Sequence, residues 1–214
     1  MTTQPQARLR SDARRNRDQI VAAAKLLFVE SGTDLPMEEI ARRADVGVGT
    51  LYRRFPDRDS LIRAVAEDGL RGVVDDARAA QAEEPTAWAA LVRLLRHSPN
   101  LRLMIRLALL SERAWTAVRQ DPQLGRFRRD IMAVLDELVV GAQAEGALRA
   151  DVGSGDVVAL ISLLLRPATA GSEALAATLL ERALVVMLDG LRARPGSPLP
   201  GRPITASDLT RAKR

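Results

Sequence analysis

Apolar residues in the N-terminal part of the chain recur every three or four positions, which is the spacing of an amphipathic helix. This spacing predicts helices over residues 13–31, 37–44 and 48–54. Gly32 follows the first of them, where a C-cap is expected. Residues 45–47, Asp-Val-Gly, predict a tight turn between the second helix and the third.

Longer helices are predicted over the rest of the chain, separated by proline and glycine. They cover residues 57–80, 86–97, 101–120, 124–144, 156–165 and 172–191. Asp57 is the expected N-cap of the first of these, with Ser60 three residues later. We therefore predict a helical N-terminal domain over 1–56, a larger helical body over 57–192, and an extended, weakly ordered tail over 193–214 that is rich in proline and glycine.

Composition supports an all-α fold. Hydrophobic residues make up 47% of the 214 residues and aromatic residues only 3%, so alanine, leucine and valine must fill the core. Strong helix formers dominate. The chain has no cysteine, which excludes disulfides and thiolate metal sites, and we expect neither a metal nor a cofactor. The N-terminus lacks the apolar segment of a secretory signal and no long apolar run predicts a membrane span, so a cytoplasmic protein with no membrane partner is expected.

Net charge is +5, and arginines concentrate in residues 1–17 and 40–58. A basic surface permits nucleic-acid binding without demonstrating it. The second cluster includes the segment VGVGTLYRRF, residues 46–55. One interpretation of its glycines is a nucleotide-binding loop. However, Tyr52 stands where a dinucleotide fingerprint has its third glycine, no strand precedes the segment, and it lacks the Gly-Lys-Ser/Thr of a P-loop.

A helix-turn-helix accounts for the segment better. That motif requires a helix, a turn of three or four residues and a second helix at a steep angle, and residues 37–44, 45–47 and 48–54 supply them in order. Gly49 has no Cβ and so lets the backbone of the second helix approach a phosphate. The first N–H groups of that helix can meet the same kind of anion. Thr50 and Tyr52 offer hydroxyl groups to phosphate. Positive charge is added by Arg53, Arg54 and Arg58.

The texts RRNRDQIVAAAKLLFVESG and MEEIARRADVGVGTLYRRFPDRDSLI make residues 13–62 resemble the DNA-binding domain of the TetR family of transcriptional regulators. The C-terminal texts AEGALRADVGSGDVVALISLLLR and LLERALVVMLDGLRA resemble its SbtR-like group. The resemblance implies a homodimer whose short helices enter the major groove of a roughly palindromic operator. It places Thr50, Tyr52 and Arg58 at phosphate contacts, and Val48, Gly49, Arg53 and Arg54 on or beside the groove-facing surface.

The chain departs from the family pattern at the turn and before the first helix of the motif. Asp45 stands where glycine is common, and aspartate tolerates left-handed geometry better than most residues. Leu35-Pro36 replaces a usual hydroxyl residue, for which Thr33 is a candidate substitute. The N-terminal arginines, Arg17 among them, form either a DNA-contacting arm or a solvated leader.

Two further sets of residues lie in the body. In this family the helical body often encloses a small-molecule pocket, although residues of this kind are more often plain core. The pocket candidates are Trp88, Leu91, Leu95, Met104, Leu107, Trp115, Phe127 and Met132. The resemblance also implies a four-helix dimer interface built from the last two helices of each subunit. Its candidates are Val157, Leu160, Ile161, Leu164, Leu175, Leu179, Leu180, Leu184 and Met187.

The favoured function is therefore a transcriptional regulator, most simply a repressor that a small-molecule effector releases from double-stranded operator DNA. An architectural or protein-responsive DNA-binding module, with no small ligand, remains open. Nothing supports an enzyme, since the chain has one histidine, no cysteine and no nucleophile motif.

Overall fold

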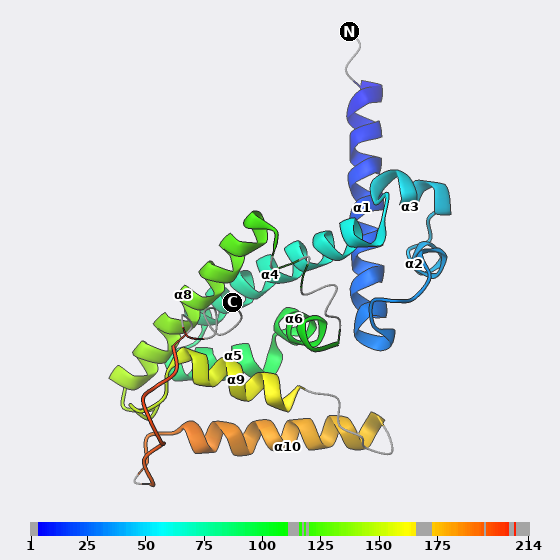
Figure 1. Ribbon diagram of the computed structural model, residues 1–214. Helices are drawn as coiled ribbons and strands as arrows, with labels where there is room; N and C mark the ends of the chain where they lie inside the picture. The colour runs from blue at the N-terminus through cyan, green and yellow to red at the C-terminus, as the bar shows by residue number, and fades with distance from the viewer. Residues whose placement is uncertain are drawn as a thin grey trace. The chain divides into compact units, whose positions relative to one another are not determined.

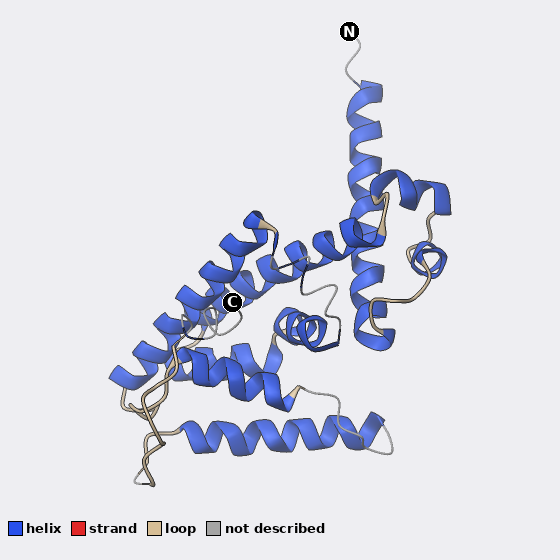
Figure 2. Ribbon diagram, viewed as in Figure 1, coloured by secondary structure: helices blue, strands red, loops and turns tan. Residues whose placement is uncertain are grey.

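The computed structural model describes residues 4–110, 120–165, 173–194 and 196–205, together with 116, 118 and 208. Over that part of the chain the secondary structure is helical, with no strand, and it confirms the predicted all-α class (Figures 1 and 2). The helices are α1 (Gln4–Ser31), α2 (Met37–Arg43), α3 (Val48–Arg54), α4 (Arg58–Glu83), α5 (Ala87–His97), α6 (Pro99–Leu110), α8 (Pro122–Ala144), α9 (Ser154–Leu164) and α10 (Glu173–Leu191). None of these helices is both long and apolar enough to cross a membrane.

The chain divides into two compact units. The first contains residues 1–69 and 106–125, and the second contains residues 70–105 and 126–214. The sequence placed a boundary at residue 56 instead, because Pro56-Asp57 interrupts the helical pattern there. The first half of α4 belongs with the N-terminal helices, since Lys25 Nζ of α1 lies 2.5 Å from a carboxylate oxygen of Asp68.

In the first unit, α1, α2 and α3 pack against one another. Fully buried side chains from each of them, and from the start of α4, form its core: Ile20, Phe28, Ile40, Leu51, Leu61 and Ile62. The predicted end signals are present. Gly32 closes α1 with a φ of 79°, and Asp57 Oδ1 accepts the Ser60 N–H at 2.6 Å at the start of α4.

Helix α1 begins at Gln4, earlier than the start predicted near residue 13. The added stretch reads QPQARLRSD and lacks the apolar periodicity on which the prediction relied. Its Gln, Ala, Arg and Leu residues are nevertheless good helix formers, and a helix already nucleated at 13–31 is extended at little cost.

The second unit has one large apolar core. It is built from α4, α5, α8, α9, α10 and the loop between α8 and α9. Trp88 and Leu91 of α5 and Leu138 of α8 belong to it, with Leu148 of the loop and Leu188 of α10 packed into the same cluster. Helix α5 begins with the Thr86 hydroxyl accepting the Ala89 N–H at 3.1 Å.

Helices α9 and α10 lie side by side in this unit (Figure 1). The chain that leaves α10 was predicted to be extended and weakly ordered. Residues 196–205 are not helical, but several of their backbone groups are hydrogen-bonded to the loop before α9 and to the first turn of α9. The partners, Arg149, Asp151 and Asp156, are distant in sequence, and a proline-rich composition does not reveal them.

Candidate nucleic-acid interface

The turn between α2 and α3 has the hydrogen-bond pattern of a Schellman motif. The Val46 N–H donates to the Ala41 carbonyl at 3.0 Å, and the Asp45 N–H donates to the Arg42 carbonyl at 3.3 Å. Asp45 occupies the left-handed position with a φ of 53°, where glycine is usual. The turn thus forms despite the departure from glycine, as predicted.

Helix α3 has only seven residues, and it is held by a single buried side chain of its own, Leu51. Phe55, its C-terminal neighbour, is also buried. These two residues point inward because they are four positions apart, a little over one helical turn. Val48 and Tyr52 flank this buried side and are 41% and 42% exposed, and Gly49 and Arg53 on the far side are exposed as well. A short helix therefore presents one complete face to solvent.

Two side-chain contacts organise that exposed face. The Arg53 guanidinium donates to the Thr50 hydroxyl at 3.1 Å, so two of the predicted DNA-contact residues touch each other. The Tyr52 hydroxyl lies 3.4 Å from Glu38 Oε1 of α2 and donates to it. Gly49 is open: a Cβ there would meet nothing within 4 Å. An external phosphate can therefore approach the α3 backbone at that point.

Arg58 and Thr33, two further predicted DNA-contact residues, are also brought together. The Arg58 guanidinium donates to the Thr33 carbonyl at 2.5 Å. The Thr33 residue is only 4% exposed, so its hydroxyl offers little surface to DNA in this conformation. Arg54 lies on the exposed surface. A guanidinium nitrogen of Arg17 in α1 lies 3.9 Å from a carboxylate oxygen of Glu67 in α4, so the carboxylate partly offsets the positive potential of Arg17.

Sequence reasoning missed Glu38 and left Arg42 and Arg43 off the list of contacts. Glu38 bonds to a residue fourteen positions away, so no local pattern could reveal it. The two arginines lie in the last turn of α2 and are exposed. A run of arginines just before a predicted turn was the available signal for them. They add positive charge to the α2 side of the motif.

The predicted pocket residues lie largely in buried positions. Trp88, Leu91, Leu95, Met104 and Leu107 are buried, and Phe127 and Met132 are half-buried. Trp115 lies outside the described residues. Burial is what both a packed core and a pocket wall require, so a ligand pocket stays a prediction. Within the described chain, no group of three histidine, aspartate or glutamate side chains is placed to hold a metal ion.

The predicted dimer residues divide by exposure. Val157, Ile161 and Leu184 belong to the core of their own protomer. Leu164, Leu180 and Met187 are half-buried, whereas Leu160, Leu175 and Leu179 are exposed. Other large apolar side chains of α9 and α10 are exposed as well, and the prediction omitted them: Leu163, Val185 and Val186. The exposed apolar side chains of α9 and α10 therefore include residues that the sequence pattern did not single out.

Comparison with known proteins agrees with this geometry. Residues 20–65 match the family model for bacterial regulatory proteins of the tetR family, and residues 86–193 match the C-terminal domain of SbtR-like transcriptional regulators. An HTH-type transcriptional regulator of Staphylococcus aureus is 40% identical over 63 residues, which are 29% of this chain and 34% of that protein. The chain thus spans about a third of the curated relatives that it matches.

Two solved structures match most of the chain. A TetR transcriptional regulator of Streptomyces coelicolor is 34% identical, covers 82% of this chain and 98% of its own, and has a TM-score of 0.61. A TetR regulatory protein of Mycobacterium vanbaalenii is also 34% identical, covers 86% and 99%, and has a TM-score of 0.57. With a helix-turn-helix in its first unit, the chain belongs to the TetR family of transcriptional regulators, with an SbtR-like C-terminal part.

Proposed function

We propose that the protein is a sequence-specific repressor that binds operator DNA as a homodimer and is released by a small-molecule effector. The observation that carries the DNA part is the exposed face of α3. A seven-residue helix with one buried side chain of its own leaves Val48 and Tyr52 exposed and Thr50 half-buried, with exposed arginines at its end. A helix of this size fits the major groove of B-DNA.

The residues of this face have different roles in the proposal. The Thr50 and Tyr52 hydroxyls and the Arg58 guanidinium bind phosphate and fix the position of the helix. Val48 and Arg53 lie nearest the base edges and set the sequence preference. Because Arg53 contacts Thr50 in the DNA-free protein, binding exchanges this contact for contacts with DNA. The contact of Tyr52 with Glu38 is exchanged in the same way.

Dimerisation is supported by the exposed apolar face of α9 and α10. Val186 is 72% exposed and Leu163 is 59% exposed, and Leu160, Leu175 and Leu179 extend the face. Exposed apolar side chains on two neighbouring helices are typical of an interaction site. A twofold axis would pair the face with itself and place two α3 helices for two operator half-sites.

The effector part of the proposal follows from linkage. An effector releases DNA only if it binds more tightly to a dimer geometry that does not fit the operator. The buried apolar residues of α5 and α8 are where such a ligand is proposed to bind. A partner protein acting on the same equilibrium is the alternative. We propose no catalytic role, and place the regulator with the DNA in the cytoplasm.

The proposal is tested by measuring the affinity of single variants for a labelled fragment from upstream of the protein's own gene and for a random duplex. Tyr52→Phe and Arg58→Ala are expected to weaken both complexes together, by about tenfold each, because each removes a hydrogen bond to a charged phosphate. Arg78→Ala is the control. Arg78 is an exposed arginine on the same helix as Arg58, in the second unit, and its loss is expected to change neither affinity.

Val48→Ala and Arg53→Ala are expected to change which sequences are preferred, as measured by selection from a randomised duplex library. Unchanged binding by all four variants at α3 and α4 would overturn the assignment of this face to DNA. A thermal-shift screen of small molecules tests the effector separately. Hits that also lower operator affinity support the repressor mechanism.

A further inference from the structure

The end of α10 and the loop before α9 are joined by backbone hydrogen bonds. The Arg149 N–H donates to the Leu191 carbonyl, and the Ala193 N–H donates to the Ala147 carbonyl, each at 3.0 Å. These bonds flank an isolated antiparallel bridge between Leu148 and Arg192. The chain leaving α10 is therefore directed back across the loop that leads into α9. We call the next segment, residues 196–205, the C-terminal strap.

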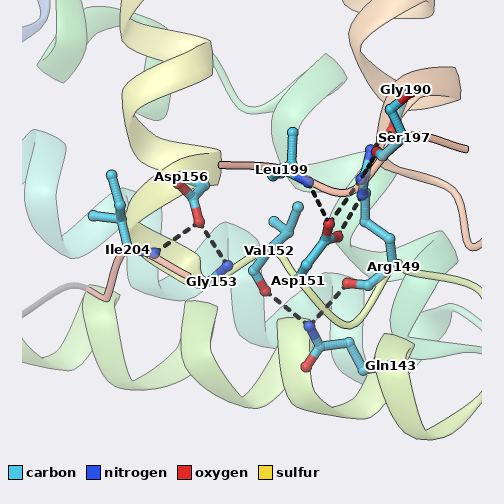
Figure 3. Close-up of polar contacts among 10 residues, drawn as sticks. All are labelled: Gln143, Arg149, Asp151, Val152, Gly153, Asp156, Gly190, Ser197, Leu199 and Ile204. Carbon is cyan, nitrogen blue, oxygen red and sulfur yellow. Dashed lines mark hydrogen bonds and ion pairs between the residues drawn. The ribbon is translucent and has the colours of Figure 1, made fainter. Parts of the chain in front are cut away.

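Asp151 and Arg149 hold the first half of the strap (Figure 3). Asp151 accepts two hydrogen bonds from the Arg149 guanidinium, at 2.5 and 2.8 Å, and its Oδ2 also accepts the Leu199 N–H at 2.9 Å. The same guanidinium donates to the Ser197 carbonyl at 3.0 Å. An ion pair within the loop thus binds both a donor and an acceptor of the strap backbone.

Asp156, drawn in Figure 3, and Gly155 hold the second half. Asp156 Oδ2 accepts the Gly153 N–H at 2.8 Å, as an N-cap partner of α9, and the Ile204 N–H at 2.9 Å. The Gly155 N–H donates to the Ile204 carbonyl at 2.9 Å. The strap thereby satisfies an N–H group in the first turn of α9 that no intrahelical carbonyl can reach.

The two glycines at the start of α9 are required by this close approach. A Cβ at Gly155 would lie 2.5 Å from the Thr205 carbonyl oxygen, and one at Gly153 would meet the Ile204 carbonyl oxygen. Neither glycine has a positive φ, so the need is for space and not for an unusual backbone conformation. The Gly153-Ser154-Gly155 cluster does not only mark a loop. It also forms the surface on which the strap lies.

The strap is held mainly by polar contacts. Its two large apolar side chains, Leu199 and Ile204, are 41% and 38% exposed. Prolines at 198, 200 and 203 fix φ along the segment and so lower the entropy lost when it is ordered. Leu199 and Ile204, which each follow a proline, retain the N–H groups that donate to Asp151 and Asp156. At its end, Arg202 makes a two-bond ion pair with Asp208.

The position of the strap connects it to the α9–α10 pair. It joins the first turn of α9 to the chain that leaves the last turn of α10, so it ties together one end of the two helices. The exposed apolar residues Leu163 and Val186 lie on those same helices. Movement of either helix end would change the shape of that apolar face.

We propose that the C-terminal strap locks the start of α9 to the end of α10 and thereby holds the two helices in the arrangement that the homodimer requires. The inference rests on the proposed homodimer. Arg149, Asp151, Gly155 and Asp156 are then positioning residues: they act on the dimer through the helices and not by touching the partner.

Three variants of the full-length protein test the inference. Gly155→Ala keeps every strap residue but places a methyl group against the strap backbone. Gly190→Ala is the matched control, since it makes the same change at a helical glycine whose Cβ would meet nothing within 4 Å. A stop after Arg194 removes the strap altogether. Far-UV circular dichroism verifies that each variant is folded, hydrogen exchange reports on the Leu199 and Ile204 amides, and sedimentation over a dilution series gives the dimer dissociation constant.

With Gly155→Ala, the Leu199 and Ile204 amides are expected to exchange at least tenfold faster, and the dissociation constant is expected to rise at least tenfold. The truncated protein should show the same weakening, and Gly190→Ala should keep the wild-type amide exchange rates. A wild-type dimer whose dissociation constant is unchanged in both strap variants would overturn the role of the strap and leave the dimer intact. A wild-type protein that is monomeric at all concentrations would overturn the dimer itself, and the coupling with it.

Discussion

The stability of helix α3 is predicted to depend on the burial of the Leu51 side chain. An isolated helix of seven residues is far too short to be stable in water, so packing must hold it. Leu51 is fully buried and is the single buried side chain within α3. Leu51→Ala should therefore cost about 2–5 kcal/mol, from lost burial and the cavity left behind. That is a large part of the stability of an ordinary domain.

The control is Leu26→Ala. Leu26 belongs to α1 in the same unit and is 52% exposed, so the same chemical change there removes little buried surface. Its expected cost is below about 1.5 kcal/mol, half of the upper value for burying a leucine completely. Comparing the two variants separates the packing of α3 from the general effect of removing a leucine.

The assay is native-state hydrogen exchange, because two compact units need not unfold in one step. The amides to follow are Leu51, which donates to the Gly47 carbonyl, and Phe55, which donates to the Leu51 carbonyl. A cost of 2–5 kcal/mol corresponds to exchange that is about 30-fold to several thousand-fold faster. Exchange in Leu51→Ala no faster than in Leu26→Ala would refute the dependence of α3 on this side chain.

Two further predictions concern the turn and the strap. Asp45→Gly should raise the free energy of unfolding of the first unit by about 0.5–1 kcal/mol, because glycine adopts a φ of 53° without strain but is more flexible when unfolded; a fall in the urea midpoint would contradict this. The Arg149 and Arg202 guanidinium groups hold the pKa values of Asp151 and Asp208 well below the ordinary value. Lowered folded-state pKa values add stability above the ordinary aspartate pKa, and this is lost only as pH falls toward the folded values. Protection of the strap from proteolysis should therefore be constant from pH 5 to pH 8, and a loss near neutral pH would count against these ion pairs.

The helix-turn-helix could be predicted from the sequence because the residues that specify it act locally. Gly32, Asp57 and the apolar spacing around Leu51 each act within a few residues, and the elements they predict are present. Even the unusual Asp45 could be interpreted in advance, since its left-handed φ is a property of the residue and its turn.

The strap could not be predicted from the sequence, because its hydrogen bonds join residues that are distant in the chain. Asp156 looks like an ordinary helix-start residue, and nothing local shows that its carboxylate also accepts the Ile204 N–H. Prolines that suggested weak order instead lower the cost of ordering once partners exist. The exposed apolar side chains of α9 and α10 were only partly predicted for a related reason. Leu184 and Leu163 are both leucines on apolar helices, and only packing decides that one is buried and the other exposed.

The central claim is that the α3 face lies on operator DNA, and salt dependence tests it most directly. The quantity to measure is the affinity of the dimer for the upstream fragment and for a random duplex across a series of salt concentrations. If Arg54 and Arg58 of each subunit each neutralise one phosphate, log affinity should fall against log salt with a slope of about −4. The upstream fragment should also bind about a thousandfold or more tightly than the random duplex. Equal, weak and salt-independent binding of both duplexes would contradict the account.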